Sequence, residues 1–334
     1  MNNIILTTNE AAGQHLKDAI VELRPDVVIN GVYTKETLVT SQQMLRTVDC
    51  VFSTWDMPVY CTEEIQRLFP NLKAIFYAAG TTKYFVLPFL QQGIRVFSSA
   101  KVNGIPVAEF VVAQIVLANK GYFQSCRAYQ PVLWWRNFWR ARRKAESKSG
   151  NYHSRIGVVG CGFVGSAVIR LLKSYELEVV VYDPYLSEER ANMLGVKNVT
   201  LEELFSTCDV VSNHLPNTVE TQGLIDYRLF SMMKPMATFI NTGRGAQVNE
   251  YDLCHVLKQR KQMCALLDVT RHEPPYPWSS LLRLKNVFLT PHIAGSMGDE
   301  KKRLVNFALQ AYDDFLADRQ NDGEVKIEQW ERMA

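Results

Sequence analysis

The sequence has little net charge of either sign. Its 334 residues include 37 lysine and arginine residues against 34 aspartate and glutamate residues, so the formal net charge at pH 7 is only +3. Because nucleic-acid-binding domains usually carry a marked basic excess, we expect no nucleic-acid partner. The hydrophobic content of 47% is that of an ordinary globular protein, and the length suggests two domains.

The sequence also lacks paired cysteines and long apolar runs. Its seven cysteines are scattered and form no C-x-x-C pair, so we expect reduced thiols and no metal site. No stretch approaches the ~20 apolar residues that a membrane span needs. The first residues have no basic segment followed by a long apolar one, as a secretory signal would. We therefore predict a cytoplasmic protein without a membrane partner.

A glycine-rich turn, Gly160-x-Gly162-x-x-Gly165, follows a short apolar run that is typical of a buried parallel strand. In a dinucleotide-binding turn the first glycine makes the tight bend and the second lets the backbone approach a pyrophosphate. The third lets the following helix pack on the strand. The backbone N–H groups of Phe163 and Val164 would then meet the pyrophosphate. A purely structural glycine turn has the same spacing, so this motif alone leaves both interpretations open.

Asp183 favours the dinucleotide interpretation. It follows the β-branched run 178–182, which predicts the next strand. A carboxylate at this place can accept hydrogen bonds from both hydroxyls of an adenosine ribose. It also disfavours the extra phosphate of NADP, and no arginine follows it closely in the sequence. We therefore expect NAD as the cofactor.

Apolar runs alternate with helical segments along the whole chain. This alternation predicts the α/β class, with parallel sheets covered by helices on both faces. Six strands are expected between residues 155 and 290. Residues 107–120 predict a helix that is apolar nearly all round, with Pro106 in or near its first turn. The tryptophan- and arginine-rich stretch 134–144 predicts a surface loop.

Polar or titratable side chains follow nearly every predicted strand of the second half, namely Asp183, His214, Arg244, Asp268 and His292. Ligands of open parallel sheets bind beyond the carboxyl ends of the strands, so we expect one crevice there. In the first half, Ala79 and Gly80 follow a predicted strand. Their backbone N–H groups could hold a small anion, and a simple strand-to-helix turn explains them equally well.

Five ordered motifs then resemble those of the NAD-dependent D-isomer-specific 2-hydroxyacid dehydrogenases. They are Gly157-Val-Val-Gly-Cys-Gly-Phe-Val-Gly165, Asp209-Val-Val-Ser-Asn-His-Leu-Pro216, Ile240-Asn-Thr-Gly-Arg-Gly245, Leu267-Asp-Val269 with Glu273-Pro274, and Thr290-Pro-His-Ile-Ala-Gly295. The resemblance implies a Rossmann-type, doubly wound NAD domain, residues 102–295. It also implies a smaller, flavodoxin-like and discontinuous substrate domain, residues 1–101 and 296–334. The apolar helix from Val107 would lie at a homodimer interface between NAD domains.

The resemblance also implies the reaction, which interconverts a 2-keto acid and a D-2-hydroxy acid. Arg244 would hold the substrate carboxylate and stabilise charge on the carbonyl oxygen, as its planar fork of donors suits. His292 would be the acid/base, paired with Glu273. From the residues alone, an ordinary surface salt bridge remains the alternative for Arg244. A solvated loop acid remains the alternative for Glu273.

The remaining site residues follow from the same resemblance. His214, Pro216 and Thr221 would line the ribose and nicotinamide side of the cofactor. Thr242 and Asp268 would hold the nicotinamide end, with Asp268 accepting from the carboxamide. Asn103 would reach the substrate beside Ala79 and Gly80, although a hinge turn Asn103-Gly104 is an equally good interpretation.

Two other functions fit the same set of motifs. A non-catalytic, NAD-sensing scaffold like the dehydrogenase-fold transcriptional corepressors can share the fold and can retain the three catalytic side chains. Within the enzyme class, a phosphoglycerate dehydrogenase is the alternative. The side chain of the keto acid is left open by the sequence.

Overall fold

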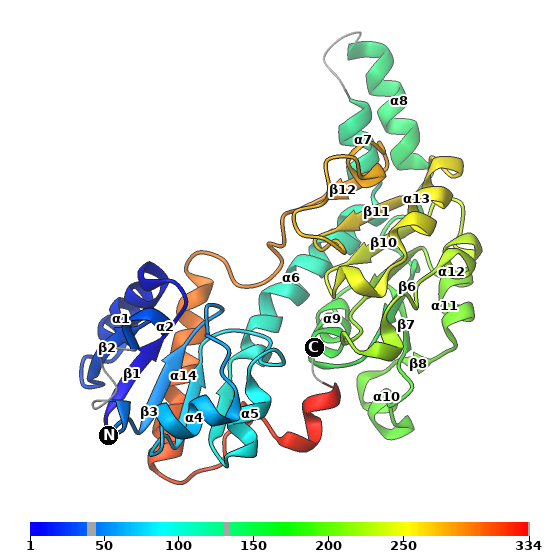
Figure 1. Cartoon of the computed structure of the whole chain (residues 1–334). Coiled ribbons are helices and arrows are strands. Elements are labelled where there is room, and N and C mark those ends of the chain that lie inside the picture. The colour runs from blue at the N-terminus through cyan, green and yellow to red at the C-terminus, as the bar shows by residue number, and fades with distance from the viewer. Residues whose placement is uncertain (39–44, 130–133, 333–334) are drawn as a thin grey trace. The chain divides into compact units, whose positions relative to one another are not determined.

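The chain forms two compact units, each built on one parallel sheet (Figure 1). One unit comprises Met1–Gly104 with Ser296–Ala334, and the other comprises Ile105–Gly295. The computed structural model describes residues 1–38, 45–129 and 134–332. The chain therefore leaves the first unit after Gly104 and returns to it at Ser296, so the first unit is discontinuous in sequence.

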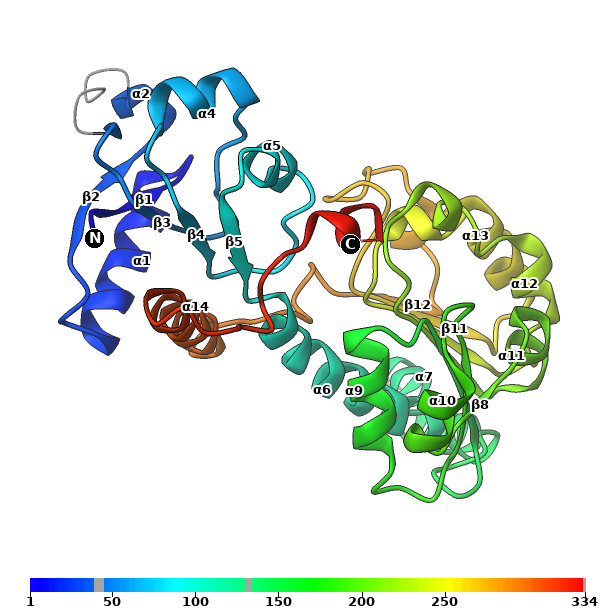
Figure 2. The same ribbon diagram turned by 90° about the horizontal axis from the view of Figure 1, so that it is seen from below.

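The first unit holds a five-stranded parallel sheet in the order β2-β1-β3-β4-β5, which is the flavodoxin-like order. Its strands are β1 (Asn3–Leu6), β2 (Ile29–Tyr33), β3 (Cys50–Ser53), β4 (Ala74–Tyr77) and β5 (Arg95–Ser98). Figure 2 shows α1 (Glu10–Leu23) and α14 (Glu300–Leu316) on one face of this sheet. The other face carries α4 (Thr62–Leu68) and α5 (Val86–Gln91), and α2 (Lys35–Leu38) lies beside α4.

The first and last helices complete the same core. Helix α1 begins after Asn9, whose side chain accepts from the backbone N–H of Ala12. Its buried side chains pack with the apolar face of α14, which is formed by Leu304, Val305, Ala308, Ala311 and Tyr312. The amide of Asn3 donates to the Tyr312 hydroxyl at 3.1 Å. Residues from the two ends of the chain therefore close one face of the sheet.

The second unit holds a seven-stranded parallel sheet in the order β12-β11-β10-β9-β6-β7-β8. Its strands are β6 (Arg155–Val159), β7 (Glu178–Tyr182), β8 (Lys197–Asn198), β9 (Val210–Asn213), β10 (Thr238–Asn241), β11 (Cys264–Leu267) and β12 (Val287–Leu289). One face packs on α6 (Ala100–Asn119), α9 (Phe163–Leu172) and α10 (Glu188–Leu194). The other packs on α11 (Leu201–Thr207), α12 (Tyr227–Met232) and α13 (Glu250–Gln259). The predicted α/β class and Rossmann-type doubly wound sheet are confirmed.

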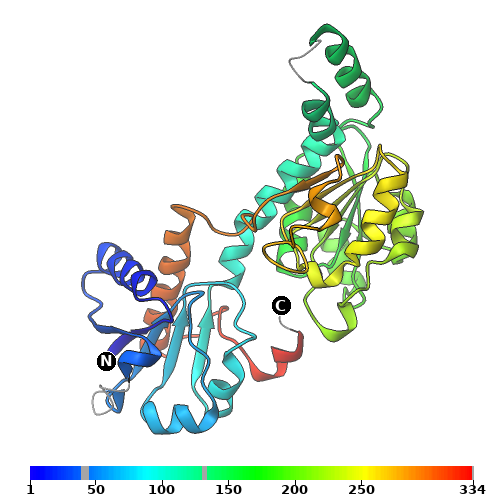
Figure 3. The same ribbon diagram turned by 45° about the horizontal axis from the view of Figure 1, so that its top comes forward.

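Two elements of this unit were predicted wrongly. The sheet has seven strands instead of the predicted six. Strand β8 escaped prediction because it consists of only two exposed residues and has no apolar run. The stretch 134–144 is the helix α8 (Trp134–Glu146) instead of a loop. It contains neither glycine nor proline, and an i,i+4 pair joins Arg142 to Glu146 at 2.7 Å. Figure 3 shows α8 lying beside α7 (Tyr122–Ala128).

Helix α6 begins at Ala100, so its predicted start at Val107 is wrong. The N–H of Asn103 already donates to Ser99 at 2.9 Å, and Pro106 lies inside the helix. A proline there removes only one helical hydrogen bond, and packing of the apolar residues compensates for it. Among the described helices α6 alone is long and apolar enough to cross a membrane, and 56% of its apolar window is buried in the fold. Burial of this kind is typical of a core helix.

Candidate active site and nucleotide site

The glycine turn between β6 and α9 needs its first and third glycines for close packing. Gly160 has a φ of +91°, and a Cβ there would lie 2.9 Å from the carbonyl carbon of His214. A Cβ on Gly165 would lie 2.0 Å from the carbonyl oxygen of Gly160. A Cβ on Gly162, in contrast, would meet nothing within 4 Å. The turn is therefore closed against the protein at two glycines and open at the middle one, where a pyrophosphate would lie.

The first N–H groups of α9 face this open turn. The helix begins at Phe163 with Gly162 as its N-cap, and no side chain caps it. The N–H groups of Phe163 and Val164 therefore have no helical acceptor and are suited to an anion. Arg190 was missed by the sequence analysis. Its guanidinium donates to the Cys161 carbonyl at 3.0 Å and brings positive charge to the turn.

Asp183 is held against the same turn. It follows β7, and its Oδ2 accepts from the backbone N–H of Cys161 at 2.7 Å. Its Oδ1 accepts from the N–H of Tyr185 at 2.8 Å. A cavity of about 550 Å³ opens beside it, lined by residues 182–184 and 198–203. This arrangement fits an adenosine ribose beside the carboxylate.

The loop after β9 carries His214, Pro216 and Thr221. The Thr221 hydroxyl donates to the Pro216 carbonyl at 2.6 Å, and the Gln247 amide donates to the same carbonyl at 2.9 Å. Nε2 of His214 lies 2.9 Å from the Ser212 hydroxyl. Burial lowers the pKa of His214 to about 4, so the ring is neutral at pH 7. Gln247 was also missed, because its place in a 3₁₀ turn gives it no sequence signature.

Thr242 follows β10 and offers a buried polar atom without a partner. Its side chain is 8% exposed, and its hydroxyl makes no hydrogen bond with any part of the chain that the structure describes. A buried hydroxyl of this kind costs free energy unless a ligand atom satisfies it. Together with the open glycine, the free N–H groups and Asp183, it shows that the residues present fit a dinucleotide.

Arg244 sits at the end of the same strand. Its backbone N–H donates to Gln247 Oε1 at 3.2 Å, and its Nη1 donates to the Gly243 carbonyl at 2.8 Å. Burial lowers the pKa of the Arg244 guanidinium, and the negative charge of Glu273 opposes this change. A Cβ on Gly245 would lie 2.0 Å from the backbone of Thr270. The Arg244 loop is therefore packed directly on the loop that leads to Glu273.

Glu273 and His292 form a close pair. His292 Nδ1 lies 2.7 Å from Glu273 Oε2, and Glu273 Oε1 accepts from the N–H of Thr270 at 3.2 Å. The two side chains are 48% and 40% exposed, so a ligand can reach them. Among the described residues none bonds Nε2 of His292. The pair therefore presents one free ring nitrogen, with the other held by a carboxylate.

Asp268 orders the loop that carries His292. Its Oδ1 accepts from the Thr290 hydroxyl at 2.6 Å and from the N–H of Ile293 at 2.8 Å. Its Oδ2 accepts from the N–H of Ala294 at 2.9 Å. The N–H of His292 donates to the Asp268 carbonyl at 2.9 Å, and His292 has a φ of 54°. The contact between Asp268 and the nicotinamide carboxamide stays a prediction.

A cavity of about 400 Å³ adjoins this pair. Asp268, Thr270, Glu273 and His292 contribute to its wall. The structure thus brings Glu273 and His292 together beyond the carboxyl ends of β11 and β12, and Arg244 follows the neighbouring strand β10. No group of three or more candidate metal ligands is found in the described ranges of the chain.

The substrate residues predicted in the first unit also lie together. The Ser98 hydroxyl donates to the carbonyls of Ala79 and Gly80. A Cβ on Gly80 would lie 3.2 Å from the amide nitrogen of Asn103, whose Oδ1 accepts from the N–H of Ser296 at 3.0 Å. The alternative of a turn at Asn103-Gly104 is wrong, because both residues lie inside α6, although the boundary between the two units does follow Gly104.

The packing of the glycine turn predicts opposite effects for two alanine substitutions. Gly165→Ala should lower the free energy of unfolding by roughly 1–3 kcal/mol or more, because the methyl group collides with a backbone oxygen. Gly162→Ala should leave stability within about 0.5 kcal/mol and weaken NADH binding instead. Urea unfolding and NADH titration of both variants test this. Equal stability losses would contradict the described turn.

Burial of His214 predicts a pH-dependent stability. In the folded protein the pKa of His214 is about 4, below its ordinary value. Burial of the neutral ring therefore costs no protonation energy at a pH above that ordinary value, and folding is favoured there. That contribution is lost as the pH falls from about 6.5 towards 4. In His214→Gln, the stability loss between pH 7 and pH 4.5 should be smaller by roughly 2 kcal/mol. Urea unfolding at both pH values measures this difference, and identical losses would contradict it.

Comparison with known proteins agrees with this geometry. Residues 115–294 match the family described as D-isomer specific 2-hydroxyacid dehydrogenase, NAD binding domain. A D-3-phosphoglycerate dehydrogenase of Archaeoglobus fulgidus is 36% identical over 234 residues, which is 70% of this chain and 43% of that enzyme. The chain thus spans less than half the length of this relative.

Solved structures with the same fold cover nearly the whole chain. D-mandelate dehydrogenase of Rhodotorula graminis aligns over 97% of both chains with a TM-score of 0.78 and 22% identity. A D-lactate dehydrogenase of Treponema pallidum aligns over 98% of this chain and 100% of its own with a TM-score of 0.73 and 22% identity. The expected cofactor, NAD, is confirmed by the family match. With the glycine turn and the ordered motifs around it, these matches show that the chain belongs to the D-isomer-specific 2-hydroxyacid dehydrogenase family.

Proposed function

We propose that this protein interconverts a 2-keto acid and a D-2-hydroxy acid with NAD(H). The observation that carries the proposal is the 2.7 Å pair of Glu273 and His292, with the Arg244 loop packed against the loop that leads to Glu273. The NAD-binding turn lies in the same unit. Reduction of a keto acid needs a cation that binds its carboxylate, a proton donor and a nicotinamide dinucleotide.

Arg244 is proposed to bind the substrate carboxylate and to face the carbonyl oxygen. Its guanidinium is half-buried, and its pKa is lowered by burial, yet it stays charged at any pH the protein meets. A half-buried arginine without a full carboxylate partner gains about 1.5–3 kcal/mol for each charge-assisted hydrogen bond to an anionic ligand. The keto acid supplies such an anion.

His292 is proposed to deliver the proton to the carbonyl oxygen from its free Nε2. Glu273 holds the opposite nitrogen, which orients the ring. Bound NADH supplies the hydride. In the oxidative direction the same nitrogen takes the hydroxyl proton, with the imidazole neutral at the start of the step.

The two units are proposed to divide the binding of substrate and cofactor. Residues 102–295 would form the NAD domain, and residues 1–101 with 296–334 the substrate domain. Ala79, Gly80 and Asn103 would then contact the keto acid, with the amide of Asn103 as a donor. A cytoplasmic homodimer formed through the NAD domains remains part of this proposal.

A substrate screen tests the proposed reaction. The purified protein is given NADH and a panel of 2-keto acids that runs from glyoxylate, hydroxypyruvate and pyruvate to bulkier side chains, with 3-phosphohydroxypyruvate included. We expect NADH oxidation with at least one of them and a D-2-hydroxy acid as product. Tight NADH binding without turnover on any keto acid would favour the NAD-sensing scaffold instead.

Removal of the acid/base gives a direct test of His292. His292→Ala should lower kcat by about 10²–10⁴-fold, because it removes the ring nitrogen that is proposed to donate the proton. NADH affinity and the melting temperature should stay near those of the wild type. The matched control is His255→Ala, an exposed histidine on α13. A His292→Ala variant with unchanged kcat would remove His292 from the mechanism.

The pairing with Glu273 predicts a loss of turnover. Glu273→Gln keeps the side-chain size but removes the carboxylate that holds Nδ1 of His292 at 2.7 Å. The imidazole is then less well oriented for proton transfer, so kcat of keto-acid reduction should fall by about tenfold or more. Initial rates at saturating keto acid and NADH measure this loss. An unchanged kcat would contradict the pairing.

A further inference from the structure

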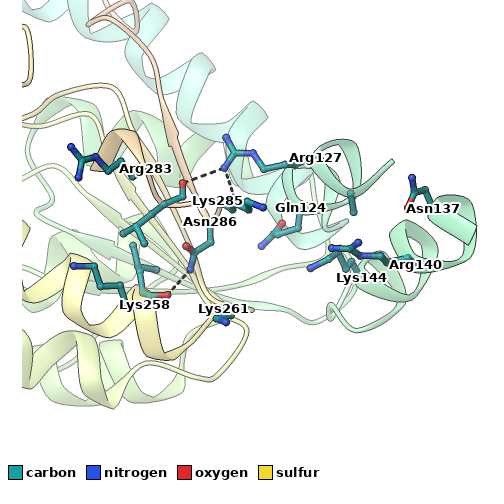
Figure 4. Close-up of a pocket in the computed structure, with 13 residues that line it drawn as sticks. Gln124, Arg127, Asn137, Arg140, Lys144, Lys258, Lys261, Arg283, Lys285 and Asn286 are labelled. Atoms are coloured by element: carbon teal, nitrogen blue, oxygen red, sulfur yellow. Dashed lines mark hydrogen bonds between the residues drawn. The ribbon is translucent and has the colours of Figure 1, made fainter. Parts of the chain in front are cut away.

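A second large cavity lies in the unit Ile105–Gly295, away from the carboxyl ends of the strands. It has a volume of about 850 Å³ and is lined by α7, α8, the end of α13 and the segment that leads into β12 (Figure 4). Its α13 residues precede β11, and residues 283–286 precede β12. The pocket is therefore at the amino ends of β11 and β12, whereas Asp268 and His292 follow their carboxyl ends.

The charged side chains that line this pocket are all positive. Arg127, Arg140 and Lys144 line it from α7 and α8. Four more cations line it from the sheet side, namely Lys258, Lys261, Arg283 and Lys285. Its lining includes no aspartate or glutamate, and within the described ranges none of Arg140, Lys144, Lys261, Arg283 and Lys285 makes an ion pair. A chain with a net charge of only +3 has thus gathered seven cations around one cavity.

Gln124 gives an independent indication of a ligand. The residue is 8% exposed, and neither its amide nitrogen nor its oxygen has a nitrogen or oxygen partner among the described residues; the Cys264 thiol, a weak hydrogen-bonding group, lies beside it. Figure 4 shows the amide among the cations, turned toward the side that carries Asn286. A buried amide with only a weak thiol partner costs free energy, and a bound polar molecule would satisfy it.

The wall of the pocket is partly preformed. The Arg127 guanidinium donates to the carbonyls of Lys285 and Val287 and stacks on the Phe288 ring, 4.2 Å from its centroid. The Asn286 amide donates to carbonyls of Leu257 and Met263. These bonds fix the side of the pocket that faces the sheet. Of the remaining cations Lys144 is half-buried and the other five are exposed, so their long side chains can turn toward a ligand.

We propose that this pocket binds a small molecule bearing several phosphate groups, at a site separate from the one that holds substrate and NAD. Its volume is within the range of about 300–1,000 Å³ that small-molecule sites occupy. Clustered lysine and arginine side chains suit phosphate oxygens, which accept several charge-assisted hydrogen bonds at once. A multiply charged anion would also relieve the mutual repulsion of the seven cations. The inference does not depend on the proposed reaction.

Titration with inorganic tripolyphosphate tests the proposal. Calorimetry is done on the whole chain in phosphate-free buffer of fixed ionic strength, with saturating NADH to fill the cofactor site. We expect saturable binding of one ligand per chain. The double variant Lys261→Gln/Arg283→Gln should bind at least about tenfold more weakly. Gln124→Leu, which keeps the size and removes the amide, should weaken binding by several-fold as well.

Matched controls separate this site from the rest of the molecule. Arg170→Gln/Lys173→Gln removes two exposed cations of the same unit at the end of α9 and should change affinity by less than about twofold. Arg244→Gln should also retain binding, which distinguishes this pocket from the proposed catalytic site. Equal weakening in the control pair, loss in Arg244→Gln, or citrate binding as tightly as tripolyphosphate would overturn the proposal. Absence of saturable binding would also overturn it. If the pocket variant then showed a changed sedimentation coefficient, the pocket would be a contact between chains.

Discussion

The carboxylate of Asp268 is the interaction on which the proposed active site depends. This carboxylate accepts hydrogen bonds from the Thr290 hydroxyl and from the N–H groups of Ile293 and Ala294. The backbone carbonyl of Asp268 accepts from the N–H of His292. These bonds tie the turn after β12 to the end of β11. They fix His292 in a left-handed conformation that a non-glycine residue adopts only when its surroundings impose it. The imidazole is thereby held 2.7 Å from Glu273.

The parallel sheet explains how residues so far apart in sequence meet. Every strand of the second unit runs in the same direction, so the loops after β6, β9, β10, β11 and β12 emerge at one edge. Two of these loops are locked by close backbone packing, Gly165 on Gly160 and Gly245 on Thr270. The nucleotide turn and the loops proposed to be catalytic are therefore positioned by backbone contacts. The basic pocket lies at the opposite, amino ends of β11 and β12.

Much of this arrangement was predictable from local sequence signals. Thr200 and Asn249 precede their helices and cap them, as such residues commonly do, with side chains that accept from the backbone N–H groups of Glu203 and Asp252. The glycine turn and the polar residues after each strand located the nucleotide site. The misses have physical causes: β8 has no apolar run, and α8 is amphipathic with exposed aromatics. Gln247 and Arg190 act through contacts that only tertiary folding creates. The hydrogen bonds of Asp268 to the turn after β12 are likewise tertiary contacts that no local sequence pattern predicts.

The most direct measurement of the central claim follows the hydride from the cofactor to the product. The wild-type protein is incubated with NADH that carries deuterium at the transferred position and with the best keto acid, and the product is resolved on a chiral column and by mass spectrometry. The account predicts a D-2-hydroxy acid with one deuterium at C2, formed at a rate that depends on His292. An L product, a product without deuterium at C2, or no product from any 2-keto acid would contradict it.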